Sequence, residues 1–481
     1  MADNIQFPSI ERFPSTFSFG ITANAYQIEG AYSSYGKGES IWDIFSHCPD
    51  KIYDHSNGNI ACDTYHLYKD DIRLLKELGC QNYHFSISWS RILPTGRVDN
   101  INQAGLDYYN SLIDCLIENG ITPSITLYCW DYPMALHREY EGWLSEKSHD
   151  DFLDYAELCF DIFGDRVQKW ITINEPWVIA ILGHALGTQA PGHNDKPGTE
   201  PYIVMHNIIL AHAKVVRLFR SKYEGNISIT NCGTWWHPDS RSKEDILAAK
   251  RAMAFTLGWI LDPIMKGDYP SIMREIVGDR LPKFTEDEKV LIKGSSDFIA
   301  INHYTTIFAS NISARNILKN IMSPTGLQGG EDTLSVMKNK YHYFKDMKVV
   351  SNNKDLNRTD MGWYVAPMGL SKILQYLHKH YSGEIHILES GYAGFELDYK
   401  SAINDHNRIK YLDRYIRELH KSIQKGVNVK CYNVWTLLDC YEWHLGYTKK
   451  FGLVHVDFNT QERTPKLSYY WLSNLFKNMK L

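Results

Sequence analysis

Short runs of β-branched and aromatic residues alternate with longer amphipathic segments along most of the chain. Runs of this length and composition are typical of buried strands. We expect eight of them: 17–22, 83–89, 124–128, 170–173, 226–230, 297–301, 385–388 and 431–435. A regular alternation of strand and helix favours a parallel sheet, because each crossover between parallel strands needs a helix-sized connection.

The segments between these runs have helical spacing and end at glycine or Asn-Gly, which are good helix stop signals. Helices are expected at 68–78, 106–118, 149–163 and 409–425. Eight strands favour an α/β fold of one (β/α)8 TIM barrel over residues 1–481, with long loop insertions. The alternative is an open doubly wound sheet, but the Gly-x-Gly-x-x-Gly turn typical of that fold is missing. Residues 310–359 read as a long loop on the active-site side, before the seventh strand.

The amino-acid composition of the chain limits which kinds of partner and which compartment are expected. The 481 residues include 51 basic and 56 acidic side chains, a net charge of -5, so a nucleic-acid partner is not expected. There is no run of about 18 apolar residues, and we expect no membrane span. Nine cysteines without a Cys-x-x-Cys pair indicate reduced thiols. As written, the chain has no signal peptide and reads as cytoplasmic; if a signal has been removed, it is secreted.

Polar residues follow several of the expected strands, at the barrel end where function is normally found. They are Asn174-Glu175-Pro176, Asn302-His303-Tyr304, Glu389-Ser390-Gly391, and Trp435 followed by Asp439, Glu442 and Trp443. Glu175 and Glu389 are expected to face each other across the barrel mouth. Two carboxyl groups in different surroundings are what glycosidic bond cleavage requires. The ordinary alternative is that each glutamate caps a helix or pairs with a lysine.

The motifs around these residues resemble those of glycoside hydrolase family 1, the β-glucosidases and their relatives. The resemblance extends from about Phe13 to about Trp471, and the motif wording is most similar to animal, especially insect, members. The motifs that carry it are Phe17-Ser-Phe-Gly20, Ala25-Tyr-Gln-Ile-Glu-Gly30, Ile41-Trp-Asp43, Thr172-Ile-Asn-Glu-Pro176, Ile387-Leu-Glu-Ser-Gly391, Val434-Trp-Thr-Leu-Leu-Asp439, Glu442-Trp443 and Lys450-Phe-Gly-Leu453.

This resemblance implies a retaining mechanism, in which Glu389 is the nucleophile and Glu175 the acid/base. Their carboxyl groups are then expected about 5–5.5 Å apart, with the charge of Glu389 raising the pKa of Glu175. Asn174 would hold the sugar 2-OH, while Asn302 and Tyr304 would support the two glutamates. The remaining family positions are Gln27, Cys129, Trp130, Trp435, Glu442 and Trp443 for the glycone, Trp177 and Trp363 for the aglycone, and His84 as catalytic support.

Three positions depart from the family pattern near the chemistry. His84 stands where the family usually has an arginine, Cys129 where it has a histidine, and Ser390 where it has an asparagine. Histidine supplies a positive charge only when protonated, and cysteine is a weak hydrogen-bond donor. We therefore expect altered glycone preference or a reduced rate of hydrolysis. The alternative is a glycosidase-like barrel repurposed to bind a sugar or other small molecule, or to transfer glycosyl groups with little hydrolysis.

No metal or cofactor is expected. The sequence has no His-Glu-x-x-His and no set of cysteines and histidines at zinc-ligand spacing, and it lacks a Gly-x-Ser-x-Gly elbow and a phosphate-binding loop. The expected partner is a small-molecule glycoside substrate, and a homodimer is compatible with the sequence.

Overall fold

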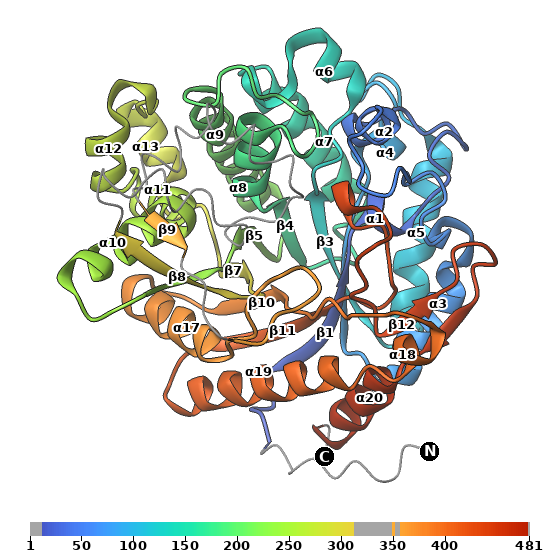
Figure 1. The fold of residues 1–481 in the computed structure, drawn as a ribbon. Coiled ribbons are helices and arrows are strands. Elements are labelled where there is room, and N and C mark those ends of the chain that lie inside the picture. The colour runs from blue at the N-terminus through green and yellow to red at the C-terminus, as the bar shows by residue number, and fades with distance from the viewer. Residues whose placement is uncertain (1–11, 312–348, 352–355, 480–481) are drawn as a thin grey trace.

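The computed structural model describes residues 12–311, 349–351 and 356–479 (Figure 1). Eight parallel strands form a closed barrel in the order β1-β11-β10-β7-β5-β4-β3-β2, and β1 pairs with β2 to close it. The strands are β1 (Ser18–Ala23), β2 (Asn82–Ser86), β3 (Thr122–Tyr128), β4 (Lys169–Asn174), β5 (Asn226–Cys232), β7 (Ile299–Asn302), β10 (Ile385–Glu389) and β11 (Val429–Trp435). Each overlaps one of the eight expected runs, with ends that differ by up to three residues, so the predicted (β/α)8 barrel is confirmed.

Helices surround the barrel on its outer face (Figure 1). The four that were expected are α3 (Thr64–Leu78), α5 (Gln103–Glu118), α7 (Ser148–Phe163) and α19 (His406–Gln424). The other long ones are α9 (Glu200–Lys222), α10 (Lys243–Met253), α17 (Met368–His380) and α20 (Leu467–Met479). The predicted helix end at Gly79 is confirmed: this residue follows Leu78, the last residue of α3, and has a φ of 83°, a conformation that glycine adopts without strain.

Shorter helices lie in the connections between the barrel strands and the long helices. They are α1 (Ala25–Ile28), α2 (Ile41–His47), α4 (Trp89–Ile92), α6 (Met134–Tyr140), α8 (Pro176–Val178), α11 (Trp259–Lys266), α12 (Ser271–Val277), α13 (Glu286–Ile292) and α18 (Tyr399–Ile403). A π-helical segment, η2 (Ile179–Leu186), continues from α8. The expected second strand ends earlier than predicted, because Trp89 already begins α4.

The predicted loop 310–359 lies mostly outside the described residues, which omit 312–348 and 352–355. Its flanks are not irregular as expected. β8 (Thr306–Asn311) pairs with β9 (Val349–Ser351) in antiparallel fashion and with β6 (Trp235–Pro238) in parallel fashion. A second small sheet joins β12 (Val454–Val456) to β13 (Arg463–Pro465).

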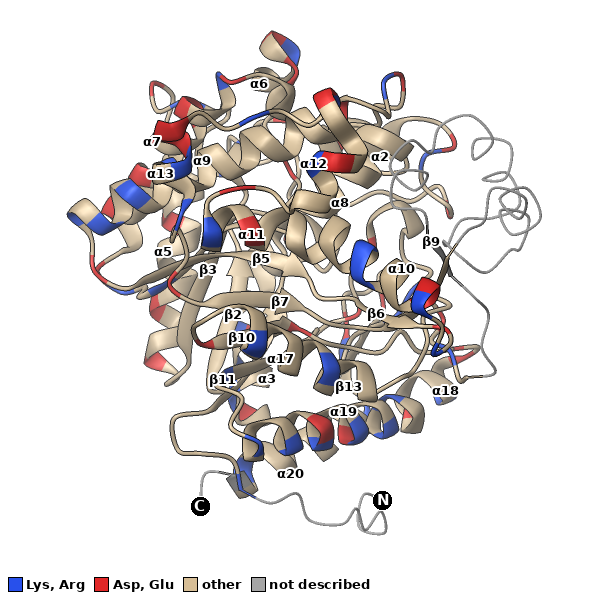
Figure 2. Ribbon diagram, turned by 90° about the vertical axis from the view of Figure 1, so that its left-hand side faces the viewer, with Lys and Arg blue, Asp and Glu red and all other residues tan. Residues whose placement is uncertain are grey.

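Helix α9 is the one helix in the described ranges that is long and apolar enough to cross a membrane by length and composition. Within its most apolar 18-residue window, 72% is buried inside the fold, as in the core helix of a barrel. Charged side chains lie mainly on the outer helices and loops, and the barrel strands carry few of them (Figure 2).

Polar side chains from neighbouring strands meet inside the barrel beneath the mouth. Gly20 of β1 leaves room for two of them, since a Cβ there would lie 2.2 Å from Asn82 Oδ1 and 2.5 Å from Asn433 Oδ1. Asn433 donates to Thr22 Oγ1 at 3.2 Å, and Thr22 donates to the carbonyl oxygen of Leu388. These contacts link β1, β10 and β11 directly below Glu389, and therefore fix the height at which β10 ends.

Candidate active site

Glu175 follows the last residue of β4 and points from the barrel end. Its backbone lies at φ 47°, an unusual conformation for a side chain of this kind, and its N–H donates to the carbonyl of Thr230 on β5 at 3.0 Å. Pro176 then starts α8, a position that proline favours because its missing N–H needs no partner there. The sharp turn leaves the Glu175 side chain partly exposed at the mouth.

Glu389 is the last residue of β10, and its side chain lies within the fold at 6% exposure. The ladder between β10 and β7 shifts register between Ile387 and Glu389, which brings Glu389 opposite Asn302. Tyr304, two residues beyond β7, donates its hydroxyl to Glu389 Oε2 at 2.6 Å. The side chain is therefore held in one orientation rather than left mobile at the strand end.

Asn302 links the two strand ends. Its Nδ2 donates to Glu175 Oε1 and to Asn174 Oδ1, both at 3.1 Å. Tyr304 follows closely along the same segment and holds Glu389. The expected support of the two glutamates by Asn302 and Tyr304 is thus present as direct hydrogen bonds.

Three carboxyl groups influence one another at the mouth. Burial raises the pKa of Glu175 to about 7. Burial first, and then the charges of Glu175 and Glu442, raise the pKa of Glu389 well above its usual value. Burial and Glu175 raise the pKa of Glu442 to about 8. The sequence-based argument gave the charge of Glu389 as the cause of the shift at Glu175, whereas burial is the main cause. Glu175 and Glu442 therefore exchange protons near neutral pH, and the charges of Glu175 and Glu442 keep the pKa of Glu389 raised.

His84 does not supply the positive charge of the arginine that the family usually has at this position. Its Nδ1 shares a hydrogen bond with Ser124 Oγ at 2.8 Å, and its Nε2 shares one with Thr126 Oγ1 at 2.7 Å. Burial, followed by the charge of Lys169, lowers the pKa of His84 to about 3. The imidazole is therefore neutral, and both ring nitrogens are engaged by hydroxyl groups of β3.

The expected glycone residues gather around a pair of indoles. Trp130 and Trp443 lie with ring centroids 4.5 Å apart, and Trp130 Nε1 donates to the carbonyl of Asn174 at 2.9 Å. Gln27 Nε2 donates to Glu442 Oε2 at 3.3 Å. Trp130 and Trp443 have positive φ values of 69° and 55°, as Glu175 does. Backbone strain of this kind concentrates at functional sites, because the surrounding fold must enforce it.

Two other expected glycone residues, Cys129 and Trp435, are also buried. Cys129 is 1% exposed, and its sulfur accepts a hydrogen bond from Asn174 Nδ2 at 3.4 Å. Trp435 is 3% exposed at the end of β11, where its N–H donates to the carbonyl of Ser390 at 3.0 Å. Cys129 thus orients Asn174, and Ser390 holds the strand ends together through its backbone.

The expected aglycone side is also aromatic. Trp363 lies 5.1 Å from Tyr304 and 6.0 Å from Phe451, measured between ring centroids. Trp177 is half-buried in the turn after Glu175. Phe451 belongs to a motif that sequence analysis quoted without giving it a role.

Sequence reasoning missed two residues that act on the catalytic pair. Burial raises the pKa of both glutamates, while the Asn24 side chain acts to lower the pKa of Glu389, and the Cys232 thiol, at the end of β5, acts to lower that of Glu175. Asn24 lies inside the N-terminal motif region, between Gly20 and Ala25, so its proximity to the site was a usable signal. Cys232 ends a predicted strand, which is the other signal that could have found it.

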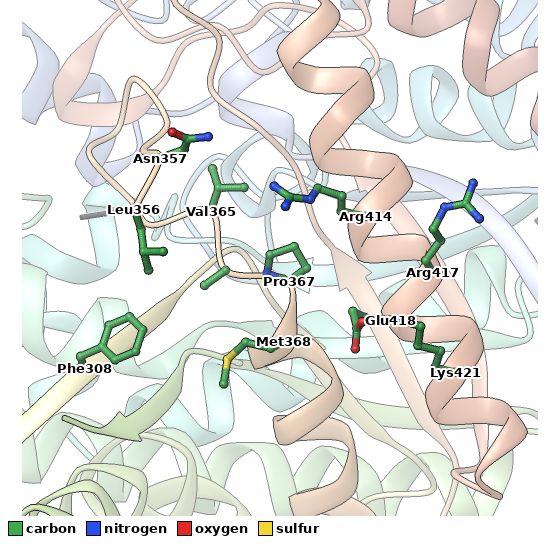
Figure 3. Close-up of a pocket in the computed structure, with 11 residues that line it drawn as sticks. Phe308, Leu356, Asn357, Val365, Pro367, Met368, Arg414, Arg417, Glu418 and Lys421 are labelled. Atoms are coloured by element: carbon green, nitrogen blue, oxygen red, sulfur yellow. Dashed lines mark hydrogen bonds and ion pairs between the residues drawn. The ribbon is translucent and has the colours of Figure 1, made fainter. Parts of the chain in front are cut away.

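Two further features of the described chain are separate from this site. A hollow of about 770 Å³ lies between α19 and the segment before α17, with Phe308, Val365 and Met368 opposite Arg414 and Arg417 (Figure 3). It contains neither Glu175 nor Glu389. Glu396, Asp439 and His455 have metal-ligand spacing, but the Lys466 ammonium group already lies 2.5 Å from Glu396 and 2.8 Å from Asp439.

Comparison with known proteins decides the family. The model of glycosyl hydrolase family 1 matches residues 9–481. The chain belongs to glycosyl hydrolase family 1. It is 43% identical to β-glucosidase 40 of Arabidopsis thaliana, over 97% of this chain and 92% of that protein. It is 42% identical to furostanol glycoside 26-O-β-glucosidase of Hellenia speciosa, over 97% of this chain and 83% of that protein.

Solved structures of family 1 enzymes have the same fold. A rice β-glucosidase superposes with a TM-score of 0.90 at 42% identity, covering 96% of this chain and 98% of that one. A family 1 β-glucosidase from Thermotoga maritima gives 0.88 at 38% identity, covering 98% and 99%. This family 1 chain is accordingly a glycoside hydrolase of the retaining β-glycosidase type. These relatives come from plants and a bacterium and do not test the expected likeness to animal members.

Proposed function

We propose that this family 1 enzyme hydrolyses β-glucoside-like O-glycosides, with Glu389 as nucleophile and Glu175 as acid/base. The supporting observation is the hydrogen-bonded unit that joins the two strand ends: Tyr304 holds Glu389, while Asn302 holds both Glu175 and Asn174. The pair lies at the end of the barrel where active sites of this fold are found.

In the first step, a Glu389 carboxylate oxygen forms a bond to the anomeric carbon. The bond from that carbon to the leaving oxygen breaks, and Glu175 gives its proton to this oxygen. In the second step, Glu175 takes a proton from water, whose oxygen displaces Glu389 from the sugar. A pKa of about 7 suits Glu175 to both proton transfers near neutral pH.

Relatives support a glucose-like glycone. Several are named β-glucosidases, and a variant of the rice enzyme was solved in a covalent complex with glucose at a TM-score of 0.89 and 41% identity. They do not favour the alternative of a repurposed barrel. We also propose a changed glycone preference or a lower rate than in relatives that carry the arginine, because His84 is neutral and engaged by Ser124 and Thr126.

We further propose that the protein works in a reducing compartment. No disulfide joins its nine cysteines, all of which lie in the described part of the chain. Six of them are buried and reach oxidants only after local opening, Cys115 and Cys232 are half-buried, and Cys48 is exposed. Comparing the activity of oxidised and reduced protein tests this: a requirement for oxidation would contradict it.

The catalytic assignment is tested with aryl β-D-glucosides. Glu389→Gln should reduce kcat by at least about 10⁴-fold for every leaving group, because the nucleophile is lost. Glu175→Gln should impair nitrophenyl glucosides strongly but spare dinitrophenyl glucoside in the first step, since that leaving group departs without a proton. Glu244→Gln, at an exposed position on α10, is the matched control. Equal rates for wild type and Glu389→Gln would contradict the proposal.

A further inference from the structure

Tyr304 holds Glu389 from a part of the chain that lies outside the barrel strands. It falls between β7, which ends at Asn302, and β8, which begins at Thr306. Its hydroxyl donates to Glu389 Oε2 at 2.6 Å. The place of this hydroxyl depends on the Tyr304 backbone, so the contacts that fix this backbone bear on the orientation of the Glu389 carboxyl group.

Two tyrosines of α19 contact the Tyr304 backbone. The hydroxyls of Tyr411 and Tyr415 donate to the Tyr304 carbonyl oxygen at 2.9 and 3.3 Å, respectively. A carbonyl oxygen has two lone pairs, so it can accept both hydrogen bonds. The two tyrosines lie one helical turn apart, and their rings stack with centroids 3.9 Å apart at 19°. Both side chains are buried, so their hydroxyls need partners inside the fold.

Tyr415 also connects this unit to the expected aglycone side. Its hydroxyl accepts a hydrogen bond from the Ala366 N–H at 3.2 Å. Ala366 shortly follows Trp363, whose ring centroid lies 5.1 Å from that of Tyr304. A single buried hydroxyl therefore contacts both the Tyr304 carbonyl and the segment that carries Trp363.

Helix α19 is itself held close to the barrel mouth. The Arg408 guanidinium, near the start of the helix, donates to the carbonyl oxygen of Tyr392 at 3.3 Å and to that of Lys450 at 2.9 Å. Tyr392 lies in the loop after β10, shortly beyond Glu389, and Lys450 lies beyond β11. The helix that supplies the two tyrosines is thus bonded to the loops after both strands.

We propose that Tyr411 and Tyr415 are positioning residues for the reaction: from α19 they fix the Tyr304 backbone, and through the Tyr304 hydroxyl they set the orientation of the Glu389 carboxyl group. This inference rests on the proposed role of Glu389 as nucleophile. Because the action is indirect, each tyrosine affects the rate only while the Tyr304 hydroxyl is present. Tyr411 has the shorter hydrogen bond and the larger effect.

The test is a double-mutant cycle with Tyr411→Phe and Tyr304→Phe, measured as kcat/KM for dinitrophenyl β-D-glucoside. This leaving group needs no proton, so the ratio reports on attack by Glu389, and its reactivity keeps the rate of Tyr304→Phe measurable. Tyr411→Phe should lower kcat/KM about five- to tenfold, because one positioning hydrogen bond is lost. In the Tyr304→Phe background the same substitution should change kcat/KM by less than about twofold.

Tyr469→Phe is the matched control. Tyr469 is also buried, and its hydroxyl donates to the carbonyl oxygen of Leu74 at 2.6 Å, between α20 and α3. The control should lower the melting temperature about as much as Tyr411→Phe does, but keep kcat/KM within about twofold of wild type. A purely structural role of Tyr411 would instead give the same loss of kcat/KM with and without the Tyr304 hydroxyl.

Tyr415→Phe is an independent second variant, and it provides the test if Tyr411→Phe does not fold. It should lower kcat/KM about two- to fivefold, again only while the Tyr304 hydroxyl is present. The inference is wrong if Glu389→Gln is inactive while both tyrosine variants keep the wild-type kcat/KM, or lose the same factor in both backgrounds. Turnover that persists in Glu389→Gln would contradict the proposed function, and this inference with it.

Discussion

Asp439 and Glu442 lie three residues apart on the loop after β11, yet their surroundings are opposite. Lys466 lies 2.8 Å from Asp439, and although burial works against ionisation, this lysine holds the pKa of Asp439 below its usual range. Glu442 has the neutral Gln27 as its partner, and burial together with the charge of Glu175 raises its pKa to about 8.

The difference separates a structural carboxylate from a functional one. Asp439 belongs to a cluster with Glu396, Lys466 and Arg408 that ties the loops after β10 and β11 to the C-terminal segment. The mouth carboxyl groups Glu175, Glu389 and Glu442 have neutral donors instead. A cation would fix their charge, whereas neutral donors leave the protons of Glu175 and Glu442 exchangeable near neutral pH. Functional sites often keep such locally unfavourable groups, which other contacts must offset.

Breaking the structural cluster should have the largest effect on stability. Lys466→Met leaves Asp439 buried without its cation, and we expect a loss of about 3–5 kcal/mol in the free energy of unfolding. Chemical denaturation measures it. The double variant Lys466→Met/Asp439→Asn should recover part of the loss, because the unpaired charge is removed. Lys243→Met, on the exposed start of α10, should stay within about 0.5 kcal/mol of wild type.

Removing a mouth carboxyl group should raise the free energy of unfolding, which is the opposite of the effect expected for Lys466→Met. A carboxyl with a raised folded-state pKa favours the fold below its unfolded pKa and loses that advantage as pH rises through about 8. Glu442→Gln should therefore match wild-type stability near pH 4.5 and exceed it by on the order of 1–2 kcal/mol at pH 8, while activity falls. Thermal unfolding at both pH values measures this. A lower stability at pH 8 would contradict the comparison.

The smallest effect is expected at Cys129. Its sulfur is a weak acceptor, so Cys129→Ala should lower kcat/KM for aryl β-D-glucosides only about two- to fivefold, through looser positioning of Asn174. Cys159→Ala, at a buried cysteine of α7 outside the site, should affect stability but not this ratio. A loss of more than about a hundredfold at Cys129 would show that the thiol contacts substrate directly.

The strands and the residues at their ends were predictable, because periodicity marks a buried strand and the barrel places every strand end at one mouth. Glu175, Glu389, Asn302 and Tyr304 were found in this way. The partners of individual side chains were not predictable. The engagement of His84 on β2 by Ser124 and Thr126 of β3 depends on packing between strands about 40 residues apart in sequence.

The central claim, that Glu389 attacks the sugar, is tested most directly by covalent trapping. Incubation with dinitrophenyl 2-deoxy-2-fluoro-β-D-glucoside, followed by peptide mapping with mass spectrometry, should reveal one fluoroglucosyl group per chain, attached to Glu389. Attachment to Glu175 or Glu442 would contradict the account, as would the absence of any adduct in protein that turns over the corresponding glucoside.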